Sequence, residues 1–110
     1  MIYEILEAIN IARMKKDTAE EILSNVPEDK IFYLNNGLKL RNLKDLHQAL
    51  AEMQDDTFSH HVNSKKNDFS CWITNVINDK RLAKEIVKTK SKDVLFNKVD
   101  KRISQLQSIK

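Results

Sequence analysis

The spacing of apolar residues between positions 69 and 77 constrains the fold of this chain more than any other feature. Phe69, Trp72, Ile73, Val76 and Ile77 recur at i, i+3, i+4, i+7 and i+8, which is the pattern of one buried stripe on an amphipathic helix. Weaker stripes of the same period lie on both sides of it along the chain. The sequence therefore predicts a mainly α-helical fold, a compact bundle of five or six helices.

Residue types that commonly cap helix N-termini precede these stripes and indicate where the helices begin. The helices are predicted at about residues 43–53, 57–62, 69–77, 80–89 and from 92 onward. The predicted caps are, in order, Asn42, Asp55 or Asp56, Asp68, Asp79 and Ser91.

One short β-hairpin is predicted ahead of these helices, at about residues 31–40. Two β-prone runs flank the sequence Asn35-Asn36-Gly37, and Gly37 readily adopts the positive φ that such a turn needs. Because a lone hairpin is only marginally stable in water, we expect it to lie on helices or to pair with another chain.

Residues 2–26 are predicted to form a long N-terminal amphipathic helix. Their apolar residues follow a heptad-like seam that Lys16 interrupts, and the capping-box pattern of Thr18 and Glu21 leaves open a break into two helices. The seam could pack on the rest of the chain or pair with a protein partner, including a second copy. We therefore expect an N-terminal helix within residues 1–26, able to mediate dimerisation, and a small helical domain in residues 27–110.

The cysteine count and the hydropathy pattern bear on where the protein resides. Cys71 is the single cysteine, so no intramolecular disulfide can form, and a reducing, cytoplasmic location is expected. No apolar run approaches the roughly 20 residues of a membrane span, and no signal peptide is expected. Membrane insertion is therefore not expected.

Charge is divided unequally between the two halves of the chain. Residues 1–62 carry a net charge of −4, whereas residues 63–110 hold 12 Lys and Arg against 5 Asp and Glu, a net charge of +7. A basic half of this kind attracts nucleic acid or an acidic protein, although the same lysines could simply form a solvated surface. The basic residues expected to bind are Lys65, Lys66, Lys80, Arg81, Lys84, Lys88, Lys98, Lys101 and Arg102.

These residues favour a non-catalytic binding or adaptor domain that docks a partner macromolecule. The alternative is a protein that binds duplex DNA without sequence preference, because lysine outnumbers arginine and reads charge rather than base edges. Trp72 lies on the apolar stripe, so we expect it in the core and not exposed for stacking on bases.

His60, His61, Asp68 and Cys71 form the only cluster of side chains that commonly ligate metals or catalyse reactions. Adjacent histidines on a helix point about 100° apart, and Cys71 falls opposite the apolar stripe, so neither a metal site nor a nucleophile set is favoured. We expect instead a structural hydrogen bond between His61 and Asp68 across a loop. No cofactor, metal or small-molecule substrate is expected, and an enzyme built on His61, Asp68 and Cys71 is the weaker alternative.

Three motifs follow one another in the middle of the chain, after a hairpin that contains Phe32-Tyr33 and Gly37. They are Phe58-x-x-His61-Val62-Asn63, Asn67-Asp68-Phe69-x-x-Trp72-Ile73 and Asp79-x-x-Leu82-Ala83. In these motifs, over about residues 28–90, the chain resembles an uncharacterised family of small domains in archaeal and bacterial proteins. Members of that family are modules appended to larger chains, sometimes beside membrane segments, and have no assigned activity. The resemblance implies fold boundaries and no reaction.

Overall fold

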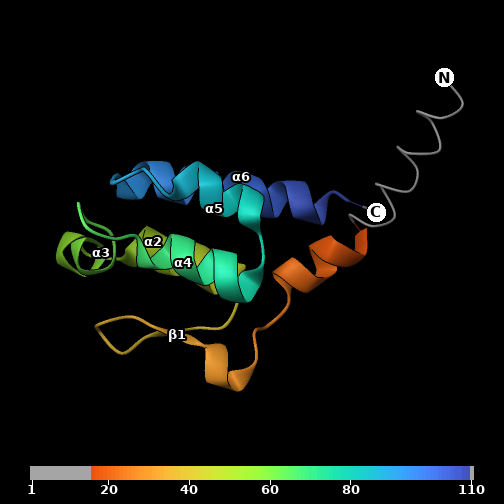
Figure 1. The fold of residues 1–110 in the computed structure, drawn as a ribbon, viewed down its shortest axis with the longest axis horizontal. Coiled ribbons are helices and arrows are strands. Elements are labelled where there is room, and N and C mark those ends of the chain that lie inside the picture. The colour runs from red at the N-terminus through yellow and green to blue at the C-terminus, as the bar shows by residue number, and fades with distance from the viewer. Residues whose placement is uncertain (1–15, 110) are drawn as a thin grey trace, which may run out of the picture.

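The computed structural model describes residues 16–109, and over that range the protein is mainly helical with one two-stranded antiparallel hairpin (Figure 1). Residues 16–23 are helical and lead to a 3-10 turn, η1 (Glu28–Lys30), and then to the strands β1 (Phe32–Tyr33) and β2 (Lys39–Leu40). The later elements are α2 (Leu43–Glu52), α3 (Asp55–His61), α4 (Asp68–Trp72), the π-helical turn η2 (Ile73–Ile77), α5 (Lys80–Ile86) and α6 (Lys92–Gln107). The predicted fold class is confirmed.

Three helices begin at the predicted side-chain caps. The side chain of Asn42 accepts a hydrogen bond from the backbone N–H of the third residue after it, at 2.8 Å. The side chains of Asp79 and Ser91 each accept the equivalent hydrogen bond at 3.2 Å. Each cap satisfies a backbone N–H group that the first turn of the helix would otherwise leave without a partner.

Two other predicted caps were wrong. Asn67, not Asp68, caps α4, and its Oδ1 accepts the N–H of Ser70 at 3.0 Å. Asp68 already lies inside the first turn of α4, and its carboxylate is turned toward His61. The helix α3 begins at Asp55 and no side chain caps it.

The predicted helix with the Trp72 stripe is present, but its second half is wider than an α-helix. The segment runs without interruption through α4 and η2 and ends where Asn78 adopts a left-handed conformation with φ of 67°. The backbone N–H groups of Asn78 and Asp79 both donate to the carbonyl of Ile73, which closes this end of the helix.

Figure 1 shows α5 and α6 side by side in one layer, α2 and α4 in a second layer, and the hairpin on the far side of α2 and α4. The hydrophobic core lies between these layers. Its fully buried residues come from every helix of both layers and from β2: Leu40, Leu43, Leu46, Leu50, Phe69, Ile73, Leu82, Ile86, Leu95 and Val99. Burial of so many aliphatic side chains is the main driving force for this arrangement.

The hairpin lies on helices, which was one of the two predicted alternatives; the other was pairing with another chain. Phe32 pairs with Leu40 across the two strands, and its ring lies 5.2 Å from that of Phe69 and 5.7 Å from that of Trp72. The indole Nε1 of Trp72 donates to the carbonyl of Lys30 at 2.9 Å. Trp72 is 6 % exposed, so its predicted place in the core is confirmed.

Residues 16–26 belong to the same core as the rest of the described chain. Ala19 and Ile22 are buried in it, Leu23 and Val26 are partly buried against it, and Lys16 is exposed. The remainder of the predicted N-terminal seam, residues 2–15, lies outside the described residues, so dimerisation through it stays a prediction.

Candidate functional site

Four of the predicted basic residues lie on the solvent side of α5 and the turn that follows it. On the opposite side of this helix, the side chains of Leu82, Ala83 and Ile86 are buried in the hydrophobic core. The exposed residues are Lys80, Arg81, Lys84 and Lys88. Arg81 also forms an i,i+4 ion pair with Glu85 at 3.7 Å, which neutralises part of its charge.

The basic residues of α6 border this side of α5. Arg102 reaches across to the N-cap of α5, where its Nε and Nη2 donate to the carboxylate of Asp79 at 2.7 and 3.1 Å. Lys98 is one helical turn before Arg102 on the same side of α6, and the exposed Lys101 lies next to it. Lys98, which is half-buried, and Lys101, which is exposed, therefore lie on the flank of α6 that carries Arg102 toward α5.

Arg102, one of the residues predicted to bind a partner, is engaged within the fold instead of projecting freely. Its side chain is 15 % exposed and Asp79 is 2 % exposed, so the two form a largely buried ion pair that joins α6 to α5. A buried carboxylate needs such a partner because burial penalises its charged form. Sequence spacing could not show this, since the residues are 23 positions apart.

We use the name lysine face for the basic residues on the solvent side of α5 and on the adjoining flank of α6: Lys80, Arg81, Lys84, Lys88, Lys98 and Lys101. Of the carboxylates in residues 63–109, four contact a cationic or imidazole side chain: Asp68, Asp79, Glu85 and Asp100. Seven lysines in the same range form no ion pair with any described residue: Lys65, Lys80, Lys84, Lys88, Lys90, Lys98 and Lys101. Most of the lysines of this half are therefore not compensated by a direct ion pair within the part of the chain that the structure describes.

The two predicted loop residues, Lys65 and Lys66, lie in a tight turn between α3 and α4. An isolated antiparallel bridge between Val62 and Asn67 closes this turn. Lys65 is exposed, whereas the Nζ of Lys66 donates to Oδ2 of Asp68 at 2.9 Å. Of these two lysines, only Lys65 forms no ion pair with a described residue and so has its ammonium group free to contact a partner.

His61 is held on both sides of its ring. Nδ1 lies 3.0 Å from Oδ2 of Asp68, and Nε2 accepts the backbone N–H of Asn35 at 3.1 Å. Because Nε2 accepts, Nδ1 carries the proton and donates it to the carboxylate, so the ring is a neutral imidazole with one defined tautomer. The hydrogen bond expected between His61 and Asp68 is thus joined by a second one, which attaches the hairpin to α3.

The carboxyl group of Asp68 feels two opposing effects. Burial would raise its pKa, but hydrogen bonds from Lys66 and His61, together with the positive charge of Lys66, outweigh burial and hold the pKa below its usual value. Asp68 therefore remains ionised at neutral pH and acts as the common acceptor of the two side chains.

Cys71 projects away from the core, as its place opposite the apolar stripe predicted. It is exposed, while its neighbour Trp72 is buried. The imidazole of His61 is 5 % exposed and both of its nitrogens are engaged, so it has no lone pair to offer a nucleophile or a metal. Among residues 16–109, no group of three or more His, Cys, Asp or Glu side chains is placed to hold a metal ion.

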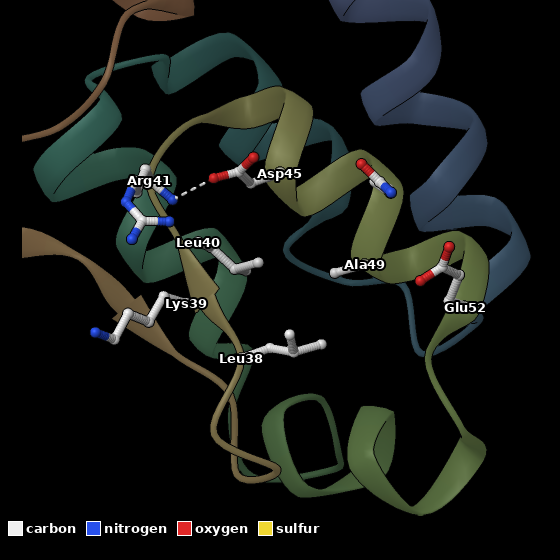
Figure 2. Close-up of a pocket in the computed structure, with 8 residues that line it drawn as sticks. Leu38, Lys39, Leu40, Arg41, Asp45, Ala49 and Glu52 are labelled. Atoms are coloured by element: carbon white, nitrogen blue, oxygen red, sulfur yellow. Dashed lines mark hydrogen bonds between the residues drawn. The ribbon is translucent and has the colours of Figure 1, made fainter.

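A shallow groove runs between the hairpin and α2 (Figure 2). It has a volume of about 220 Å³ and carries both apolar and charged side chains. Leu38 is 54 % exposed at its edge, and the backbone N–H of Arg41 donates to Asp45 at 2.9 Å at its closed end. The cationic and carboxylate side chains that line it are Lys39, Arg41, Asp45 and Glu52, so the groove has no net preference for either sign of charge.

Two further polar contacts between distant elements were not predicted from the sequence. His47 of α2 stacks on Phe96 of α6 with ring centroids 4.5 Å apart, and its Nε2 lies 2.9 Å from Asp100. Lys92 donates to the carbonyl of Met53 and to Asp55. Both contacts depend on how the helices pack, and local spacing carries no signal for them.

Comparison of the chain with protein-family models, with curated proteins and with solved structures found no match. The resemblance drawn from the three central motifs therefore stays a hypothesis. No helix in the described range has the length and apolar character needed to cross a membrane.

Proposed function

We propose that this chain is a non-catalytic binding domain that docks an acidic macromolecular partner on the lysine face. The observation that carries the proposal is the set of lysines on α5 and α6 that have no carboxylate partner among residues 16–109. Uncompensated like charges on one surface cost stability through mutual repulsion, and an acidic partner relieves that cost. The exposed free thiol of Cys71 suits a reducing, cytoplasmic setting.

Duplex DNA is the acidic partner that the composition of the face favours. Its lysines, in place of arginines, offer compact charges to phosphate groups and no planar fork for reading bases. Arg81, the one guanidinium on the face, is already paired with Glu85. Binding should therefore be insensitive to base sequence.

The salt dependence of binding tests this proposal. If Lys80, Lys84, Lys88, Lys98 and Lys101 contact phosphates, a plot of log affinity against log salt concentration should have a slope of about −4.5. Replacing Lys80, Lys84 and Lys101 together by Glu should abolish binding. The matched control replaces Lys30, Lys39 and Lys44 by Glu, which changes the net charge equally but leaves the face intact.

Each outcome of the titration has a meaning. Loss of binding in the face variant and its retention in the control would support duplex binding through the lysine face. No binding by the unaltered protein at about 50 mM salt, where phosphate contacts are strongest, would exclude duplex DNA and leave an acidic protein as the partner. Equal loss in both triple variants would show that net charge alone is responsible. Light scattering on the same samples would test whether a second copy pairs through residues 2–26.

A further inference from the structure

A second basic feature lies beside the lysine face, in a cavity of about 340 Å³ between the 62–67 turn and the segment that follows α5. The side chains that line it include those of Lys65, Lys66, Lys88 and Lys90, together with Ser64, Thr89 and Cys71, and no Asp or Glu lines it. We call this cavity the lysine pocket. Its volume falls at the low end of the range for sites that bind small molecules.

Hydrogen bonds fix the two walls of the lysine pocket to each other. The side-chain amide of Asn67 donates to the carbonyl of Ile86 at 2.9 Å, and the hydroxyl of Ser70 donates to the carbonyl of Ala83 at 3.1 Å. Asn67 and Ser70 are both buried, at 7 % and 5 % exposure. Because the walls are held in place before any ligand arrives, little ordering would be needed on binding.

The turn that carries Lys65 and Lys66 is itself held by three hydrogen bonds from Asn63. Its backbone N–H donates to the carbonyl of Lys66, its Oδ1 accepts the N–H of Lys65, and its Nδ2 donates to the carbonyl of Ser59, all at 2.9 to 3.0 Å. The lysine side chains can therefore reorient from a fixed backbone.

The same contacts weaken one obstacle to anion binding. The pocket lies at the C-terminal end of α5, where exposed carbonyl groups would repel a negative charge. Here the carbonyl of Ala83 accepts from Ser70, and that of Ile86 accepts from Asn67 and from the N–H of Thr89. These carbonyls are already satisfied and turned toward donors of the protein.

The charge balance of the lysine pocket is strongly positive. Lys66 is partly neutralised by Asp68, but Lys65, Lys88 and Lys90 contact no carboxylate within residues 16–109. Each lysine ammonium offers three N–H donors, and the hydroxyl groups of Ser64 and Thr89 add further ones. A ligand with two or more negative charges and several acceptor oxygens matches this donor set.

We propose that the lysine pocket binds a phosphate group, carried either by a small phosphorylated molecule or by the end of a nucleic acid strand. This site shares Lys88 with the lysine face but differs from it because it is a concave site with a fixed backbone, and the proposal does not depend on the proposed function. Its recognition is directed at one phosphate or diphosphate group and not at an extended row of phosphates.

Cys71 provides a reporter within the pocket, since it is the only cysteine of the chain and its thiol is exposed there. The test measures the rate at which the uncharged reagent iodoacetamide alkylates Cys71 in the full chain. Bound pyrophosphate should slow alkylation about tenfold when its concentration is about ten times its Kd, because the unliganded fraction falls by that factor. Sodium chloride at equal ionic strength should leave the rate unchanged. Equal rates in pyrophosphate and chloride, up to the solubility limit, would exclude a small phosphorylated molecule as the ligand.

Two double variants distinguish binding in the lysine pocket from a nonspecific effect of the protein's net charge. Replacing Lys65 and Lys90 by Gln should remove the protection by pyrophosphate. Replacing Lys80 and Lys101 by Gln removes the same charge from the lysine face and should leave the protection intact while weakening duplex binding. If both double variants lose protection equally, the effect comes from net charge and the pocket is not a site.

Short duplexes with 5′-phosphate or 5′-hydroxyl ends distinguish the two sources of phosphate. Stronger protection of Cys71 by the phosphorylated duplex would identify a strand end as the ligand. Protection by pyrophosphate, with no difference between the duplexes, would identify a small phosphorylated molecule. Protection by none of the three would overturn the proposal.

Discussion

Both ring nitrogens of His61 form hydrogen bonds that hold the fold together. Its two nitrogens connect the hairpin at Asn35 with the first turn of α4 at Asp68, and its ring packs 5.2 Å from Phe32. A buried imidazole with one donor and one acceptor is satisfied by this arrangement and needs no ligand. A histidine and an aspartate in an open cleft would suggest catalysis. Here the burial of the His61 ring and its two hydrogen-bond partners indicate a structural role.

The stability of the protein should depend on pH through Asp68. A carboxyl group whose pKa is lowered in the folded state stabilises the fold fully above its unfolded pKa of about 3.9 and loses that contribution as pH falls through the lower folded value. Asp68→Ala should cost about 1 kcal/mol at pH 7, because hydrogen bonds from His61 and Lys66 are lost. Urea denaturation across pH should show the difference between wild type and variant shrinking below pH ~4. A difference that grows in acid would contradict the assigned role.

The ion pair of Asp79 and Arg102 should be much more costly to break than any surface contact. Arg102→Met keeps the length of the side chain but leaves the carboxylate of Asp79 buried without its partner, which should destabilise the fold by about 3 kcal/mol. Lys101→Met changes the adjacent exposed residue and should change stability by less than about 0.5 kcal/mol. Thermal and urea denaturation of the two variants would measure the contrast, and equal effects would show that the pair contributes little.

The hairpin has almost no stability of its own, because each strand has only two paired residues. It is held by the elements beneath it. Phe32 packs on aromatic rings of α4, the carbonyl of Lys30 accepts from Trp72, and the N–H of Asn35 donates to His61. The hairpin and the pair α3–α4 should therefore form and unfold as one cooperative unit.

Substitutions at Trp72 should separate packing from hydrogen bonding at this junction. Trp72→Phe keeps most of the apolar contact with Phe32 but loses the donor to Lys30, so it should cost about 1–2 kcal/mol. Trp72→Ala also leaves a cavity and should cost about 3–5 kcal/mol. Far-UV circular dichroism in urea measures both variants. Wild-type fluorescence comes from this single Trp, and emission at the wavelength of fully hydrated indole would contradict its burial.

At the scale of the described molecule, residues 16–109, some carboxylates form ion pairs where helices meet, and most lysines of the second half lie on helix sides that face solvent. Asp79 and Asp100 are used to join α5 to α6 and α6 to α2. Most of the lysines that form no ion pair belong to the lysine face or line the lysine pocket. This distribution should make the isolated protein slightly less stable than its core allows, since like charges on α5 repel one another.

A charge reversal at Lys84 should therefore stabilise the fold while weakening duplex binding. Lys80 and Arg81 lie one turn before it, so Lys84→Glu replaces repulsion by attraction, partly offset by a negative charge near the C-terminal end of α5. We expect a gain of about 0.5 kcal/mol at low salt. The gain should vanish at ~1 M salt, where charges are screened within about 3 Å. Denaturation at both salt concentrations gives the measurement, and a loss of stability at low salt would show that Lys84 has a structural role.

Local sequence determined which segments are helical and where most of them begin. The apolar period from Phe69 to Ile77, the caps at Asn42, Asp79 and Ser91, and the turn at Gly37 all depend on interactions within a few residues, so one sequence was enough to predict them. It also predicted that Trp72 faces inward and Cys71 outward, because a helix fixes the angle between neighbouring side chains. The error at Asp68 arose because Asn67 and Asp68 are both good caps, and only contact with His61 distinguishes them.

Tertiary packing alone decided which charged residues remain available to a partner. Arg102 and Lys98 share one side of α6, yet the first is withdrawn into an ion pair with Asp79 and the second borders solvent. The lysine pocket likewise joins residues 65 and 66 to residues 88 and 90 through hydrogen bonds of Asn67 and Ser70 to α5. These contacts bridge 13 to 23 positions along the chain, and helical periodicity says nothing about which faces of different helices meet. The sequence thus determined the elements and the excess of positive charge, while the packing of α4, α5 and α6 determined where that charge is exposed.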